Sequence, residues 1–442
     1  MPDGHLEAHR ALTRGGVAFI SSSVLTTLSG LGYWLIAAHM MSRSDLGRGS
    51  SLLSALLTVS AIAQLNYARA LPGLLPRART DARRMLAVAY ARVICASLIL
   101  GLGFALIAPR VDRQFHYVLS FPFFAILFAI AVPLLSLFTL EDAVLATVRR
   151  SVIVPFENAS FGILKLLLLP ALVVIGMRPL SFLIAISWVT PLIIIVVPLN
   201  IYLFARAVPQ AAATFPSSMP KEGTWVRYDF AGYLFWLLGT LPLPVLTITI
   251  LGPTRSAAFY VPFSIATAIE VMILNLGNTL TSEMSRTRGR FSPPTAIFVW
   301  RIWVLLGLLS ICLIAIAPYV LALFGSQYEA AGTSIFRVLM VAIVPRSVLF
   351  FCIAATRART AAGRGRNSGV IILVLQAVTC LGTLGFGLIA MRSMGSLGMA
   401  LGFTLASTLA AAIAVFYVRP PSFRSAFRPD VSHESTAAET GP

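Results

Sequence analysis

The stretch SVIVPFENASFGILKLLLLPALVVIG, residues 151–176, decides the class of fold. A run of about 20 mostly apolar residues is what a helix needs to cross a bilayer. Lys165 nevertheless lies near the middle of this run. An ammonium group at the bilayer centre costs about 2.5–3.5 kcal/mol on insertion scales, so such a residue usually faces a wet cavity or a partner. We therefore expect a membrane-spanning helix whose lysine has a role.

Composition places the whole chain in the membrane-protein class. Of its 442 residues, 58% are hydrophobic and 11% are charged, whereas a soluble domain has roughly 25% charged residues. A soluble helical protein with a large core does not explain so many apolar runs of bilayer length. The net charge of +18 comes almost entirely from arginine and does not indicate nucleic-acid binding. We predict an all-α integral membrane protein with about twelve transmembrane helices.

The apolar runs divide the chain into two halves of six spans. The predicted spans are 17–41, 49–75, 85–107, 118–140, 153–176, 180–205, 228–251, 256–282, 295–324, 333–356, 370–391 and 397–418. The predicted domains are a cytoplasmic N-terminal tail (1–16), an N-terminal six-helix lobe (17–205), a cytoplasmic linker (206–227), a C-terminal six-helix lobe (228–418) and a cytoplasmic disordered tail (419–442).

Basic residues near the span ends predict the orientation. With the N-terminus in the cytoplasm, the inner segments carry 21 Arg and Lys residues and the outer loops carry 7. Both termini are therefore expected on the cytoplasmic side of a bacterial plasma membrane. Six spans per half give the halves the same orientation. VPLLSLF at 132–138 also aligns with VPRSVLF at 344–350, which favours a parallel repeat with a central cavity between the lobes.

The sequence contains no recognisable catalytic or cofactor motif. We find no P-loop, no glycine-rich dinucleotide turn and no zinc-ligand spacing. The four cysteines (Cys95, Cys312, Cys352 and Cys380) lie inside apolar runs and are interpreted as small core residues. GMALG at 398–402 is a small-xxx-small pattern, interpreted as internal helix packing. We expect neither an enzyme nor a bound cofactor or metal.

Several stretches resemble one family of transporters. They are LIAAHMMSRSDLG at 35–47, LG at 251–252 with AAFY at 257–260 and EMS at 283–285, PYVLALFG at 318–325 with YEAAG at 328–332, and PFEN at 155–158 with Lys165. Together they resemble the polysaccharide-flippase, O-antigen-type branch of the multidrug/oligosaccharidyl-lipid/polysaccharide (MOP) exporter superfamily. The resemblance implies two six-helix lobes around a cavity that opens alternately to each side. It also implies that the chain moves an undecaprenyl-diphosphate-linked oligosaccharide for polysaccharide biosynthesis, whereas other members export drugs by cation antiport.

Charged side chains near the middle of spans are the candidate substrate contacts. Lys165, Glu270 and Arg346 supply two cations and one anion, which suits a site for a diphosphate. We predict that all three face one central cavity; the alternative is that Glu270 only neutralises a buried cation. The predicted substrate-binding set is Lys165, Arg346, Asn158, Asn275 and Asn278.

Other charged residues have weaker assignments. Glu270, Glu157 and Asp229 are candidates for ion coupling or charge pairing. Glu157 suits a cap or tie near the inner surface equally well, and Asp229 is better interpreted as a helix-start residue favoured by the helix dipole than as a proton site. Arg69, Arg92 and Arg337 are candidates for headgroup entry or release; snorkelling to the membrane surface is the alternative for Arg69 and Arg92.

The leading hypothesis is a flippase for a lipid-linked oligosaccharide, working by alternating access. The alternatives are a small-molecule or drug antiporter of the same superfamily, and a membrane glycosyltransferase or polysaccharide polymerase. The outer loops are short for such an enzyme. The expected partners are the lipid-linked substrate, membrane lipids and polysaccharide-assembly enzymes, with the monomer as the working unit.

Overall fold

The structure is a computed structural model that describes residues 29–120, 123–148, 150–213, 225–286, 293–361 and 368–418. Within these ranges it is helical without strands, and eleven helices are long and apolar enough to cross a membrane. The predicted all-α membrane fold is confirmed. Both predicted tails (1–16 and 419–442), the beginning of the first span and residues 214–224 of the linker lie outside the described residues.

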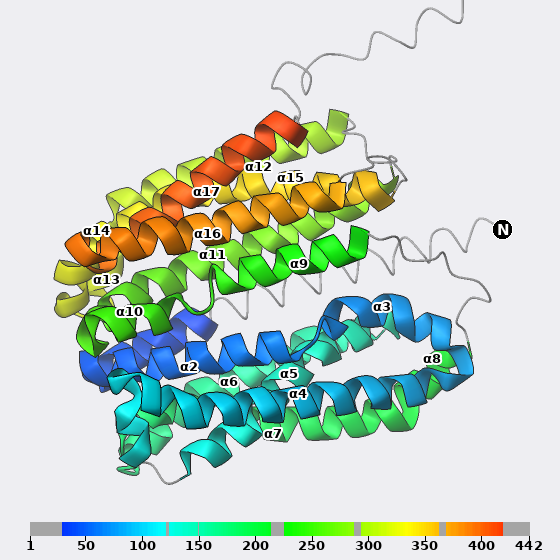
Figure 1. The fold of residues 1–442 in the computed structure, drawn as a ribbon, viewed down its shortest axis with the longest axis horizontal. Helices are drawn as coiled ribbons and strands as arrows, with labels where there is room; N and C mark the ends of the chain where they lie inside the picture. Colours follow the sequence, from blue (N-terminus) through cyan, green and yellow to red (C-terminus); the bar gives the residue numbers. More distant parts are fainter. Residues whose placement is uncertain are drawn as a thin grey trace, which may run out of the picture.

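The N-terminal half forms one bundle, drawn from blue to green in Figure 1. It begins with the helical segment 29–40. The helices that follow are α2 (Arg43–Ala63), α3 (Tyr67–Ala78), η1 (Arg79–Asp81), α4 (Ala82–Val111), η2 (Arg113–Ser120), α5 (Phe124–Thr147), α6 (Ile153–Val174), α7 (Leu180–Tyr202), η3 (Leu203–Ala207) and α8 (Val208–Ala212).

The C-terminal half forms a second bundle, drawn from green to red in Figure 1. Its helices are α9 (Trp225–Leu238), α10 (Leu243–Leu251), α11 (Pro253–Arg286), α12 (Pro293–Ala315), α13 (Ala317–Ala322), α14 (Ser326–Val341), α15 (Ile343–Ala361), α16 (Ser368–Met394) and α17 (Ser396–Val418).

Several predicted spans are split into two helices. The second span breaks between α2 and α3, where Leu65 and Asn66 adopt positive φ values of 48° and 67°. The seventh breaks before α10, whose first turn is preceded by Pro242 and contains Pro244. The tenth breaks at Ala342, just before Pro345. Proline lacks a backbone N–H and is tolerated in the first turn of a helix, so it marks where a new helix begins.

Several helices run further than the sequence predicts, and two of them extend seven residues beyond the predicted end. α5 continues to Thr147 instead of ending at residue 140, and the helix formed by α7, η3 and α8 continues to Ala212 instead of 205. Neither glycine nor proline occurs between residues 134 and 147 to end α5. Glu141 and Asp142 follow the predicted end, and the helix carries both residues, with Glu141 buried in the bundle.

The two bundles contact each other closely near Gly47 and Ser51 of α2, Pro244 of α10 and Pro253 of α11. We call this region the α2/α10 end. A Cβ atom at Gly47 would overlap the carbonyl oxygen of Pro253, so α2 and α11 approach at backbone distance. Ser51 Oγ donates to the Pro244 carbonyl oxygen at 3.0 Å. Figure 1 shows the bundles meeting at this end, while α3 and α9 diverge at the other.

Candidate functional site

Lys165 lies inside the N-terminal bundle within a box of aromatic rings. Its side chain is 2% exposed. Its Nζ atom lies 4.1 Å from the ring centroid of Trp188 on α7, 4.8 Å from that of Phe161 on α6 and 5.8 Å from that of Tyr33 in segment 29–40. An ammonium over such rings is attracted by their negative faces, most strongly when it is desolvated. Within the described residues, Lys165 forms no ion pair with a carboxylate.

Segment 29–40 places this box beside the interface between the bundles. Tyr33 is fully buried and its hydroxyl lies 2.7 Å from Ser187 Oγ of α7. The next residue, Trp34, packs against Tyr260 of α11, with 4.4 Å between ring centroids. Consecutive residues of one helix therefore contact the two bundles. The rings of Tyr33 and Trp34, with centroids 5.2 Å apart, therefore connect Lys165 to the C-terminal bundle.

Arg346 lies in the C-terminal bundle, where Glu270 neutralises it. An Arg346 guanidinium nitrogen pairs with the Glu270 carboxylate, and both residues are under 5% exposed. Trp236 Nε1 donates to the same carboxylate oxygen at 2.7 Å, and Arg346 Nη1 donates to Ser407 Oγ at 3.1 Å. The Arg346 guanidinium carbon also lies 4.3 Å from the Phe403 ring centroid. The ion pair therefore joins α11 and α15. Hydrogen bonds connect it to Ser407 of α17 and to Trp236 of α9.

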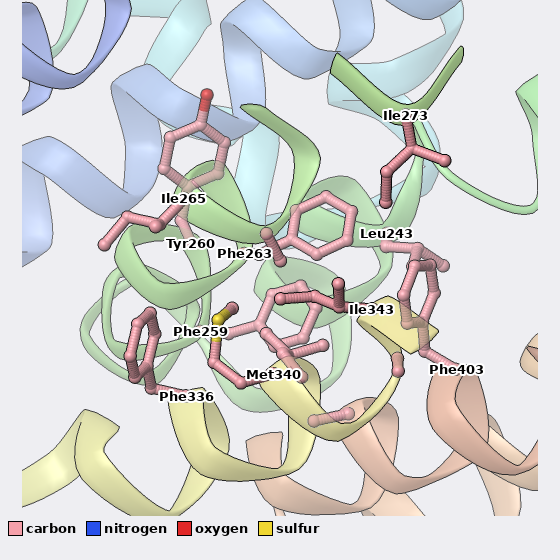
Figure 2. Packing of buried hydrophobic residues seen from close by; sticks show 14 of the residues in the cluster. Leu243, Phe259, Tyr260, Phe263, Ile265, Ile273, Phe336, Met340, Ile343 and Phe403 are labelled. Atoms are coloured by element: carbon pink, nitrogen blue, oxygen red, sulfur yellow. The ribbon is translucent and has the colours of Figure 1, made fainter. Parts of the chain in front are cut away.

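The surroundings of this ion pair are tightly packed. Figure 2 shows Phe259, Phe263, Met340, Ile343 and Phe403 interlocking between α11, α14, α15 and α17. The cavity beside Arg346 and Glu270 measures about 10 Å³, which is close to the minimum for one water molecule. In this conformation the pair has no room for a sugar or a diphosphate. This arrangement matches the alternative that Glu270 neutralises a buried cation.

The three mid-span charges thus divide into two groups. Arg346 and Glu270 lie together in the C-terminal bundle, whereas the groups that surround Lys165 come from the N-terminal bundle. A single cavity that holds all three is not seen in the described residues. The sequence could not foresee this separation, because equal depth in the membrane says nothing about which helices are neighbours.

The three candidate asparagines lie on the helices that carry the charges. Asn158 is on α6, and its Nδ2 donates to the Val154 carbonyl oxygen at 3.0 Å, one turn earlier in the same helix. Asn275 and Asn278 follow Glu270 on α11; Asn275 is half-buried and Asn278 is exposed. Their role in binding stays a prediction.

Asp229 forms an ion pair near the beginning of α9. Its Oδ1 lies 2.8 Å from Arg357 Nε of α15. The aspartate is 13% and the arginine 22% exposed at the side chain. Asp229 therefore ties two helices of the C-terminal bundle together, which fits the charge-pairing interpretation of this residue.

The predicted headgroup residues have separate environments. Arg92 Nη1 donates to the Tyr67 hydroxyl at 2.9 Å and, with Arg84 and Asp81, lines a cavity between α3 and α4. Arg337 is exposed on α14, and its Nε donates to the Ile314 carbonyl oxygen at 3.3 Å. Arg69 is part of α3, and its side chain lies outside the described residues.

The structure reveals one buried carboxylate that the sequence analysis missed, Glu141, and also buries Glu157, which the sequence analysis named as a candidate for ion coupling or charge pairing. Glu141 on α5 is fully buried and accepts a hydrogen bond from Asn200 Nδ2 of α7. Glu157 on α6 is 4% exposed, and neither of its carboxylate oxygens has a hydrogen-bond partner. Unsatisfied buried carboxylates are costly, so they attract a cation or a proton. The signal was the pair Glu141–Asp142 in an otherwise apolar run, which the predicted span end at residue 140 concealed.

The fold and the buried charges together define a class: a polytopic α-helical membrane protein of two bundles with ionisable groups in both. No family model matches the sequence, and no curated protein matches it significantly.

Solved transporters share this fold. An inward-facing and an outward-facing structure of a multidrug resistance MATE family transporter of the MOP superfamily match with TM-scores of 0.57 and 0.59, at 16% and 14% identity. A MOP superfamily transporter from Pyrococcus furiosus, described as having a binding pocket of reverse polarity, matches with a TM-score of 0.61 at 15% identity. Each match covers 92% of this chain and 94% of the other.

At these identities the likeness shows the fold, with its two bundles of helices. It agrees with the resemblance to the MOP superfamily at the level of architecture. It does not distinguish the polysaccharide-flippase branch from the multidrug branch.

Proposed function

We propose that this chain is an alternating-access transporter for an anionic, lipid-linked substrate, with an undecaprenyl-diphosphate-linked oligosaccharide as the specific candidate. The observation that carries the proposal is Lys165. It has no carboxylate partner in the described residues, and the rings of Tyr33 and Trp34 connect it to Tyr260 of the other bundle. A buried, uncompensated cation favours an anionic ligand. Arg346 supports the proposal less, because Glu270 already neutralises it.

Alternating access is supported by the closed contact at the α2/α10 end. The bundles touch there through Gly47, Ser51 and Trp34. Structures of similar fold are described in both inward-facing and outward-facing conformations. The basic residues predict that the α2/α10 end faces away from the cytoplasm.

The second candidate is a drug antiporter that exchanges an organic cation for protons or metal cations. The names of the similar structures favour this candidate over the flippase. The buried carboxylates Glu141 and Glu157 also favour it, because they suit a cation better than an anion. The two candidates therefore rest on different charges within the same bundle.

Transport by variants with a neutral residue at position 165 or 157 separates the candidates. Wild-type protein and the Lys165→Met, Lys165→Arg and Glu157→Gln variants are reconstituted in vesicles with a labelled lipid-linked sugar, and separately with a fluorescent organic cation. A hydrogen bond to a charged group contributes roughly 1.5–3 kcal/mol, so we expect Lys165→Met to lower sugar-lipid transport at least about tenfold. Lys165→Arg retains the charge and should keep more of the activity.

Two results would contradict the flippase proposal. If Lys165→Met transports the lipid-linked sugar as well as wild type, the role of Lys165 is wrong. If the chain transports the organic cation, and Glu157→Gln abolishes this while Lys165→Met does not, the drug antiporter is the correct function.

A further inference from the structure

A groove lies between the bundles on the flank formed by α4. Its volume is about 510 Å³. Its lining comes from α2, α4, η2 and α10 and includes Val59, Ile99, Gly103, Ile107, Phe115 and Val245. We call it the α4–α10 groove. Because α10 belongs to the C-terminal bundle, the groove exists only while the bundles are together at this end.

The groove has the length of one leaflet of a bilayer. Ile99, Gly103, Ile107 and Val111 are spaced by four residues, so they follow one another along one face of α4. At 1.5 Å per residue this row is about 18 Å long, and half of a hydrocarbon core of about 30 Å is about 15 Å. Ile99, Ile107 and Val111 are 71%, 61% and 79% exposed. In a membrane-spanning helix these side chains face hydrocarbon.

The polar groups at the η2 end of the groove are positively charged on balance. Asp112 is the acidic residue in the lining, and its two oxygens accept hydrogen bonds from the Gln114 backbone N–H and the Thr249 hydroxyl. Arg110 and Arg113 flank it and are both exposed. Burial raises the pKa of the nearby Tyr117 phenol, which therefore adds no negative charge. Both arginines lie outside the residues that line the groove, and a guanidinium nitrogen of Arg110 donates to the Leu106 carbonyl oxygen one turn earlier in α4. Both can supply guanidinium groups, the usual partners of phosphate oxygens, to a headgroup beside this end of the groove.

We propose that the α4–α10 groove binds one acyl chain of an anionic bilayer phospholipid whose phosphate lies at Arg110 and Arg113. The apolar lining selects a hydrocarbon chain. The row of α4 residues from Ile99 to Val111 is about 18 Å long at the rise of an α-helix, which matches one leaflet. The two arginines select an anionic headgroup. The bound chain contacts both bundles, since Val245 and Thr249 lie on α10 and the other lining residues on the N-terminal half. It therefore stabilises the conformation that is closed at the α2/α10 end.

Glycine 103 offers a direct test. Gly103 lines the groove and a Cβ atom there meets nothing within 4 Å, so Gly103→Trp directs an indole ring into the groove. Gly307 on α12 has equally free space and serves as the matched control, Gly307→Trp. Wild-type protein and both variants are placed in nanodiscs with phosphatidylglycerol that carries a photoreactive group in its acyl chain, and labelled peptides are identified by mass spectrometry. Thermal unfolding verifies that both variants fold.

The expected result is preferential labelling of peptides from α4 and α10. Gly103→Trp should lower this labelling about tenfold, equivalent to about 1.4 kcal/mol of binding free energy, and Gly307→Trp should leave it unchanged. Replacing the probe by a phosphatidylcholine analogue, or introducing Arg110→Gln with Arg113→Gln, should remove the preference.

Two results would overturn the proposal. Equal labelling of the α12 face and insensitivity to Gly103→Trp would show non-specific bilayer contact. Displacement of the label by undecaprenyl phosphate at equimolar amounts would show that an isoprenoid chain occupies the groove instead. Binding is measured without transport, so failure of the proposed transport function leaves this result unaffected.

Discussion

Two buried cations of this chain are accommodated in different ways. Arg346 is neutralised by Glu270 and held by Ser407. Lys165 is surrounded by three aromatic rings and has no carboxylate partner among the residues that the structure describes. Arginine presents several donors in a rigid fork and suits a fixed ion pair, whereas lysine carries a compact charge on a flexible stem. Lys165 is therefore the residue better able to move towards a ligand.

Removing one member of the Arg346–Glu270 pair should destabilise the protein. Glu270→Gln leaves the Arg346 cation in an apolar core, and breaking a buried pair this way typically costs about 3–5 kcal/mol. Thermal unfolding in detergent measures the loss. Replacing both residues, Glu270→Leu with Arg346→Met, should cost less than Glu270→Gln alone, because no unpaired charge remains.

The pair between Asp229 and Arg357 provides the control for this prediction. Its side chains are 13% and 22% exposed, against 5% or less for Glu270 and Arg346. Asp229→Asn should therefore cost about 1 kcal/mol or less, as partly exposed pairs do. Equal losses for Asp229→Asn and Glu270→Gln would contradict the argument from burial.

At the scale of helices, glycine decides how closely two elements pack. α16 and α17 approach at backbone distance, since a Cβ atom at Gly402 would overlap the Gly387 backbone and one at Gly398 would overlap that of Ala390. The small-xxx-small pattern at 398–402 predicts such packing, and the structure confirms that it is internal. Without a hydrophobic driving force between helices in lipid, close backbone approach supplies much of the attraction.

Gly402→Leu should therefore force α16 and α17 apart. Overpacking of a core costs about 1–3 kcal/mol where side chains can yield, and a clash with backbone should lie at the upper end of this range or beyond it. Gly385→Leu on α16 is the matched control, because a Cβ atom there meets nothing within 4 Å. The two variants are compared by thermal unfolding and by yield of folded protein in detergent. Similar values for both would refute the packing argument.

At the scale of the whole molecule, the contact between the bundles at the α2/α10 end is the feature that alternating access must break. Ser51 Oγ of α2 lies 3.3 Å from Ser256 Oγ of α11. Both residues are fully buried. If the bundles separate here during transport, a covalent link between these positions should stop the cycle.

A disulfide between Ser51→Cys and Ser256→Cys tests this movement. The exposed cysteines Cys95 and Cys312 are first replaced, whereas Cys352 and Cys380 are buried. Oxidation should abolish transport in vesicles, and a reducing agent should restore it; each single cysteine variant should be insensitive to both treatments. Full transport by the cross-linked protein would mean that this end does not open.

The sequence by itself determined the membrane class and the approximate positions of eleven of the twelve predicted spans, because hydrocarbon requires long apolar helices whatever their neighbours are. It also singled out Lys165, Glu270 and Arg346, since a charge in an apolar run is visible without a structure.

Only the tertiary structure decided which of these charges meet. Glu270 pairs with Arg346 across α11 and α15, while Lys165 meets Tyr33 and Trp188. The same holds for Glu141 and Glu157, which lie close enough to interact electrostatically; Glu141 is part of α5 because this helix continues past its predicted end. The physical reason is that burial and pairing depend on contacts between helices distant in the chain, and the hydropathy of one helix carries no information about its partners.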